Sequence, residues 1–146
     1  MASLPARFRD EIADGYVLGP VRGAVGALLG WHALGAAEEL ANVGYFGDAF
    51  HVPWIPEALV PAPRVYAVML AARVCLAVMV AIGIRARPAL GASALLGLWC
   101  LLCDRNQFHH NRYSLCCYAF LLAFTPCDRS WRVATGDVLV PRRGPF

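Results

Sequence analysis

The sequence contains no lysine, so all 13 of its basic residues are arginine. An arginine guanidinium keeps its proton across the physiological pH range, so it serves neither as a general base nor as the amine of a Schiff base. The absence of lysine therefore excludes every reaction that needs a catalytic lysine.

Charge of either sign is also scarce. Only 16% of the 146 residues are charged and 59% are hydrophobic, whereas a soluble domain usually carries about 25% charged residues. The charged residues cluster between long apolar segments. This pattern predicts one polytopic membrane domain over residues 1–146, not a soluble core.

We expect neither a cleavable signal peptide nor a nucleic-acid-binding surface. The first sixteen residues are polar and contain no apolar central region, so we expect the first membrane helix to direct the chain to the membrane. The net charge is +3, but the arginines flank apolar segments and form no stripe with interleaved aromatics. We therefore expect no nucleic-acid partner.

The apolar runs predict an all-α bundle of four transmembrane helices, at about 17–40, 64–84, 88–103 and 108–126. A helix that spans a bilayer needs about 20 apolar residues. The first two helices meet this length. The last two meet it only if part of 104–112 lies at membrane depth, inside a cavity of the bundle. The alternative is a pair of short, tilted or re-entrant helices.

The distribution of arginine predicts the orientation of the bundle, because cytoplasmic loops carry the excess of basic residues. A cytoplasmic N-terminus leaves three arginines on the outer side, namely Arg64, Arg105 and Arg112. It places eight on the inner side: Arg7, Arg9, Arg85, Arg87, Arg129, Arg132, Arg142 and Arg143. We therefore expect both termini in the cytoplasm of a bacterium, with the bundle in its plasma membrane. Arg22 would then lie near the inner end of the first helix and extend to the surface.

Two segments share the outer face in this orientation, the loop 38–63 and the polar segment 104–112. The loop is rich in aromatic residues and proline, and Trp54, Ile55 and Leu59 are suited to a segment that lies on the membrane surface.

The polar segment supplies the first candidate pocket. A histidine exchanges protons near neutral pH and a carboxylate can orient it, and both types occur among the candidates Asp104, Arg105, His109, His110, Asn111 and Tyr113. Because His109 and His110 are adjacent, we expect their side chains to point in different directions and not to share a metal. The alternative is that these polar groups cap helix ends and bind interfacial water.

Arg73 lies inside the second predicted helix and is the second candidate. An arginine at membrane depth faces the protein interior and needs a partner. Glu38, Glu39 or Asp104 would make it part of a structural ion pair. The functional interpretation is a site for an anion or a carboxylate, and Arg73 joins the candidate pocket on that ground.

The remaining candidates carry weaker signals. Cys100 and Cys103 share a helix face as a Cys-x-x-Cys pair, but they lie at a helix C-terminus, where the helix dipole disfavours a thiolate. We interpret them as buried structural residues, with thiol redox chemistry as the alternative. His32 is either a hydrogen-bonded core residue or a member of the outer cluster.

The chain resembles the HTTM-type membrane domain, the family that includes vitamin K-dependent gamma-carboxylase. The resemblance begins with Arg22 in VRGAVGALLGWHAL, continues through Tyr45-Phe46 and the turn at 82–87, and is strongest over Asp104 to Trp131. In that last stretch it rests on Tyr113, Leu115, Leu121, Asp128, Arg129 and Trp131. It covers nearly the whole chain but only the N-terminal half of a typical family member.

The departures from the family matter for function. In the carboxylase branch the lysine after the aspartate is the implied base, and here that position is Arg105. The resemblance therefore implies an HTTM-type membrane protein without carboxylase activity, whose outer pocket binds a lipid, a quinone or a partner. The partners expected are membrane lipid and a second membrane chain or another copy. The alternatives are a quinone- or thiol-linked membrane oxidoreductase and a truncated, inactive family member.

Overall fold

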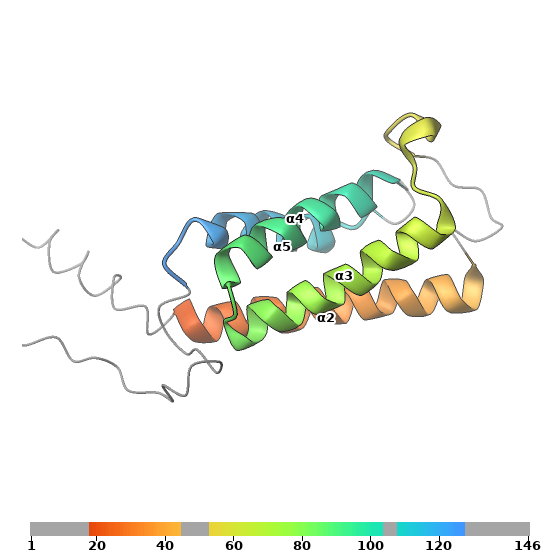
Figure 1. Ribbon diagram of the computed structural model, residues 1–146. Helices are drawn as coiled ribbons and strands as arrows, with labels where there is room; N and C mark the ends of the chain where they lie inside the picture. The colour runs from red at the N-terminus through yellow and green to blue at the C-terminus, as the bar shows by residue number, and fades with distance from the viewer. Residues whose placement is uncertain (1–17, 45–52, 104–107, 128–146) are drawn as a thin grey trace, which may run out of the picture.

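The computed structural model describes residues 18–44, 53–103 and 108–127. These residues form four α-helices and one short 3-10 turn (Figure 1). In chain order the elements are α2 (Leu18–Val43), η1 (Glu57–Leu59), α3 (Pro63–Ile82), α4 (Ala86–Cys103) and α5 (His110–Ala123). The prediction of an all-α chain with four helices is confirmed.

The predicted helix positions agree with the structure, with small shifts at the ends. Helix α2 continues three residues beyond the predicted end at 40, and α4 begins at Ala86 instead of 88. Helix α5 has only 14 residues, so it is shorter at both ends than the predicted 108–126. It ends before Pro126, because the residue before a proline disfavours helical geometry.

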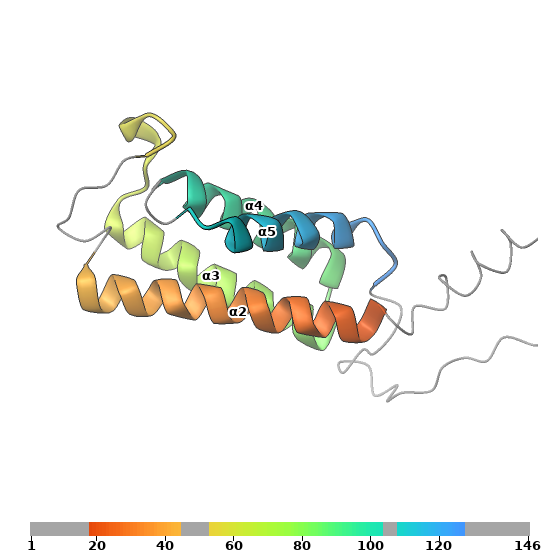
Figure 2. The same ribbon diagram turned by 180° about the vertical axis from the view of Figure 1, so that it is seen from behind.

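The four helices run alternately up and down, so that neighbours in sequence are antiparallel (Figure 1). Helix α2 packs along α3, α4 packs along α5, and α3 with α4 joins these two hairpins. Seen from behind, α2 and α5 lie on the same side of the molecule, in front of α3 and α4 (Figure 2). Helices α2 and α5 make the fewest contacts of the packed pairs.

Local sequence explains where α3 begins and ends. Pro63 occupies the first turn, where its missing N–H would have no helical partner, and Ala62 before it is extended. Gly83 ends the helix in the left-handed conformation with φ +82°, and its N–H donates to the carbonyls of Met79 and Val80. The tight turn that follows leads directly into α4.

The core of the bundle consists largely of small residues. Ala77, Ala89, Ala94 and Ala119 are almost fully buried together with larger residues such as Leu90. Small side chains let helix backbones approach closely, as is common where apolar helices pack in membranes.

Arg22 is buried at the end of this core that holds the N-terminus of α2, which corrects the expectation that it extends to the surface. Only 1% of its surface is exposed, and its Nη1 donates a hydrogen bond of 2.7 Å to the carbonyl oxygen of Cys127. The chain after α5 bends back over α2 and offers this carbonyl. Arg22 therefore joins the start of α2 to the end of the described chain.

Replacing Gly83 by alanine is expected to lower the free energy of unfolding by about 1–2 kcal/mol. An added Cβ at this left-handed position would lie 2.9 Å from Nη2 of Arg22. Gly44→Ala is the matched control, since Gly44 also has a positive φ (+90°) but no atom near an added Cβ. Equal destabilisation by the two variants in a denaturation titration would show that backbone strain alone matters and that contact with Arg22 does not.

Two of the described helices, α3 and α4, are long and apolar enough to cross a membrane. Core helices of soluble proteins meet the same criteria.

Candidate functional site: a cationic cleft

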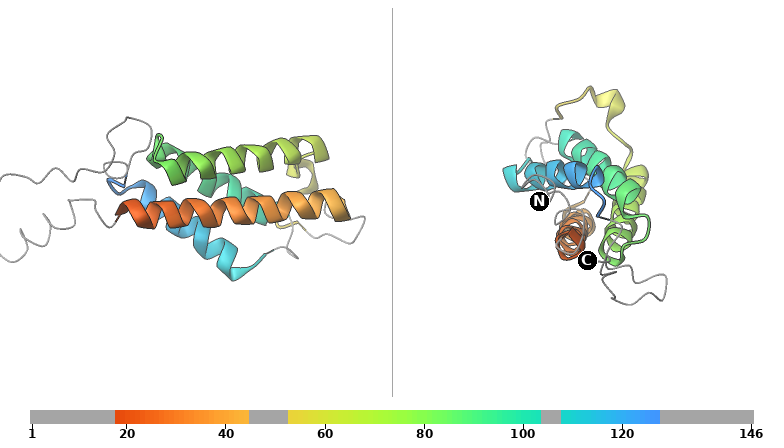
Figure 3. Two further views of the ribbon diagram at one scale, coloured as in Figure 1. Left: turned by 90° about the horizontal axis from the view of Figure 1, so that it is seen from below. Right: turned by 90° about the vertical axis from the view of Figure 1, so that its left-hand side faces the viewer.

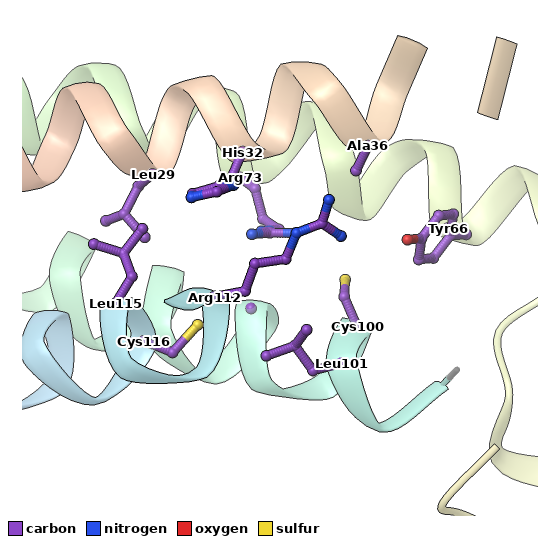
Figure 4. Close-up of a pocket in the computed structure, with 11 residues that line it drawn as sticks. Leu29, His32, Ala36, Tyr66, Arg73, Cys100, Leu101, Arg112, Leu115 and Cys116 are labelled. Carbon is purple, nitrogen blue, oxygen red and sulfur yellow. The ribbon is translucent and has the colours of Figure 1, made fainter. Parts of the chain in front are cut away.

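All four helices contribute to one cleft in the half of the bundle that contains the N-terminus of α3 and the C-terminus of α4. The side chains that face into it are shown in Figure 4. It is lined by Leu29, His32 and Ala36 of α2, Tyr66 and Arg73 of α3, Gly97, Cys100 and Leu101 of α4, and Arg112, Leu115 and Cys116 of α5.

Arg73 lies near the middle of α3 and is 9% exposed. Its guanidinium interacts with the thiol of Cys100, while its Nε is buried without a hydrogen-bond partner among the described residues. A buried donor without a partner costs free energy, so a ligand or a water that accepts from it is favoured. Of the predicted pocket residues that the structure describes, Arg73 is the one that lies inside the cleft.

Gly97 makes room for the groups on the floor of the cleft. A Cβ at this position would lie 2.6 Å from Sγ of Cys116 and 3.7 Å from Nη2 of Arg73. The missing side chain therefore allows α5 to approach α4 beside the guanidinium of Arg73.

Two more basic side chains face Arg73 across the cleft. Figure 4 shows the His32 ring and the Arg112 guanidinium pointing into the same space, and His32 interacts electrostatically with both arginines. No carboxylate occurs among the described residues that line the cleft. Glu38 and Glu39, which we expected as partners of Arg73, are exposed on α2 and do not line the cleft.

The space inside the cleft is small. Its cavity volume is about 20 Å³, measured for the centre of a water molecule, which is room for roughly one water. This space admits a single oxygen-sized group, such as one oxygen of a phosphate or carboxylate, and is too small for the ring system of a quinone.

None of the other predicted pocket residues that the structure describes lines the cleft. Asp104 and Arg105 fall outside the described residues. His109, His110, Asn111 and Tyr113 are exposed at the start of α5 and do not line the cleft. Within the described part of the polar segment, only Arg112 turns inward.

The prediction that His109 and His110 point in different directions is wrong. Their ring centroids are 4.7 Å apart and the ring planes are inclined by 30°. His109 is the extended N-cap of α5, with φ −125° and ψ 130°, so the helical angle between adjacent side chains does not apply to it. No group of three or more residues that could hold a metal ion occurs in the described ranges.

Aromatic residues join the segment between α2 and α3 to the start of α5. The N–H of Trp54 donates a hydrogen bond of 2.9 Å to the carbonyl of Leu102, and the Trp54 ring contacts Phe108 at 6.4 Å between centroids. Phe108 contacts Tyr113 at 5.9 Å between ring centroids. The described parts of 38–63 and 104–112 therefore meet at one end of the bundle, as predicted.

All six cysteines carry free thiols. Cys100 and Cys103 are both buried on α4, but only Cys100 lines the cleft, where its neighbour from α5 is Cys116. The Cys-x-x-Cys spacing thus does not bring both of its thiols to the cleft.

Sequence reasoning left Tyr66, Arg112 and Cys116 out of the candidate pocket. One usable signal was helical spacing, since Tyr66 and Arg73 lie seven residues apart and share a face of α3. Cys116 gave no signal of its own, because its place depends on how closely α5 packs against Gly97.

Comparison of this chain with family models, curated proteins and solved structures gives no match. The function is therefore inferred from the cleft and its surroundings.

Proposed function

We propose that this protein is an integral membrane protein that binds a small anionic group, a phosphate or a carboxylate, in the cationic cleft of its outer half. Four helices cross the plasma membrane of a bacterium and both termini lie in the cytoplasm. The observation that carries this proposal is the convergence of Arg73, Arg112 and His32 on a cleft whose described lining contains no carboxylate.

The surface of the bundle supports insertion in a membrane. Only 28% of the most apolar stretch of α3 is buried inside the protein, whereas a core helix of a soluble protein is mostly buried. Large apolar side chains are exposed on every helix, including Trp31, Val68, Leu95 and Leu121. Lipid is the solvent that suits such a surface on all sides.

The arginine distribution supports the orientation, with eight residues on the inner side against three on the outer side. Helix α5, at about 1.5 Å per residue, is about 21 Å long, which is shorter than the apolar core of a bilayer. Its exposed N-terminal residues then lie at the depth of the outer interface, where Arg112 reaches inward.

The chemistry of the cleft favours an oxyanion. A guanidinium offers paired N–H donors in a planar fork that matches carboxylate and phosphate oxygens. Two guanidinium groups that face one space in apolar surroundings attract an anion between them, and the His32 imidazole adds a hydrogen-bonding group beside it. The Nε of Arg73 supplies a donor whose hydrogen bond is not made within the described chain.

The small cavity favours an anion over a quinone as the ligand. The resemblance to the HTTM family stays a prediction, because the residues that line the cavity do not test it. The proposal keeps the part of that prediction that concerns a pocket on the outer side. It takes Arg73 and Arg112 as ligand-binding residues and assigns no catalytic residue.

The full chain in a neutral detergent provides the test. Sodium phosphate or sodium acetate is expected to raise its melting temperature by about 3 °C or more over sodium chloride of equal ionic strength, because an anion that binds only the folded state stabilises it. Arg73→Gln and Arg112→Gln are expected to abolish this difference.

Arg64→Gln is the matched control, since Arg64 is exposed at the outer end of α3 and does not line the cleft. The control variant should respond to the anions as the unmodified protein does. An equal response of all three variants, or no response of the unmodified protein to either anion, would contradict the proposal.

A further inference from the structure

Buried residues close some sides of the cleft, and partly exposed residues mark the side on which it opens. The lining residues at its floor, Arg73 of α3 and Cys100 of α4, are buried, and so are Ala36, Tyr66 and Leu101 toward the end of the bundle. The lining residues that keep part of their surface exposed come from the two remaining helices: His32 of α2, with Arg112 and Leu115 of α5. The cleft therefore opens sideways, between α2 and α5.

The packing of the helices agrees with this opening. Contacts between α2 and α5 are sparse compared with those inside each hairpin. Figure 3 shows α5 close to α2 near the N-terminus of α2 and diverging from it toward the N-terminus of α5. The divergence is widest at the end that carries Arg112.

Exposed apolar side chains follow the lining residues along α2 and α5, toward the inner half of the bundle. Leu28 lies one turn before His32 on the same face of α2 and is 50% exposed. Tyr118 lies one turn after Leu115 on α5 and is 65% exposed. Along the opening, the basic side chains thus lie toward the outer side, and the exposed apolar side chains lie toward the bilayer centre.

This order of groups matches a lipid of the outer leaflet, whose headgroup lies near the interface and whose acyl chains extend toward the bilayer centre. A sideways opening between membrane helices faces acyl chains, not water. An amphiphile can reach such an opening within the plane of the membrane, and each CH₂ group that it keeps out of water adds to its binding.

We propose that the anionic group bound in the cleft is the phosphate of an anionic membrane lipid, which enters between α2 and α5. Arg73, Arg112 and His32 hold the phosphate, and the acyl chains lie along Leu28, Leu115 and Tyr118. This inference rests on the proposed function and names the source of its anion.

Three probes distinguish a lipid from a free anion: inorganic phosphate, dihexanoyl phosphatidic acid, and dihexanoyl phosphatidylcholine, which has the same chains but no net charge. Each is titrated into the full chain in neutral detergent while the melting temperature is followed. The phosphatidic acid is expected to reach half of its effect at a concentration at least about tenfold below that of inorganic phosphate, because its chains add apolar contact. The phosphatidylcholine is expected to stabilise little.

Variants separate the headgroup site from general lipid contact. Arg73→Gln and Arg112→Gln should each weaken the effect of phosphatidic acid by about tenfold or more, as for the loss of a hydrogen bond to a charged group. Arg64→Gln should leave it unchanged. Leu28→Asn, at an exposed apolar side chain along the opening, should weaken phosphatidic acid while leaving inorganic phosphate unaffected.

The outcomes distinguish the two proposals. Equal half-effect concentrations for inorganic phosphate and phosphatidic acid, both dependent on Arg73, would overturn lipid entry and leave the anion-binding function standing. Stabilisation by phosphatidic acid that persists in both arginine variants would assign it to the lipid-facing surface and overturn lipid entry. The absence of any effect of the three probes would overturn both proposals.

Discussion

Arg22→Ala is expected to lower the free energy of unfolding by about 1.5–3 kcal/mol, the range for losing a hydrogen bond made by a charged group. Arg22 is 1% exposed and donates to the carbonyl of Cys127 across 105 positions of sequence. The alanine variant leaves this carbonyl without its donor and opens a cavity beneath Gly83. Unfolding by increasing amounts of dodecyl sulfate in mixed micelles measures the loss.

Arg87→Ala is the matched control for Arg22→Ala. Arg87 also donates to a carbonyl at the end of α5, that of Ala123 at 3.1 Å, but the bond is exposed. Its loss is expected to cost no more than about 1 kcal/mol. Equal losses for the two variants would show that burial of Arg22 does not determine its contribution, and Arg22→Lys should fall between the two because it retains the charge without the planar fork.

Gly26→Ala is expected to destabilise the bundle by about 2–3 kcal/mol through overpacking. A Cβ on Gly26 would lie 2.7 Å from the backbone nitrogen and 3.0 Å from Cα of Ala81 in α3. Both atoms belong to a helix backbone, so no side chain can rotate away and α2 must move from α3.

The control lies one turn earlier on the same helix. Gly23 has no atom within 4 Å of an added Cβ, so Gly23→Ala should be neutral or stabilise α2 by up to about 1 kcal/mol, through the higher helix propensity of alanine. The same denaturation series compares the pair. A neutral Gly26→Ala would contradict the close approach of α2 and α3.

The sequence predicted the helices well because each is a long apolar run bounded by polar residues, proline or glycine. The proline at the start of α3 and the glycine after it act through local backbone geometry, which sequence shows directly. The prediction for helix packing was coarser. The sequence of α2 alone does not distinguish Gly23, which has open space around an added Cβ, from Gly26, where an added Cβ meets a helix backbone.

The site was less predictable because its members are brought together by packing between helices. Arg73 was found because an arginine inside an apolar run is conspicuous. Arg112 was obscured by its polar neighbours, of which His109 and His110 are exposed. Arg22 was expected at the surface, since sequence does not show that the chain after α5 returns a carbonyl to it.

Native mass spectrometry of the full chain released from a neutral detergent tests the central claim, that the cleft holds an anionic group, most directly. We expect one anionic phospholipid bound to the unmodified protein and to Arg64→Gln, and its loss from a variant that combines Arg73→Gln with Arg112→Gln. The same bound mass on all three proteins, or no bound anion on the unmodified protein, would contradict it.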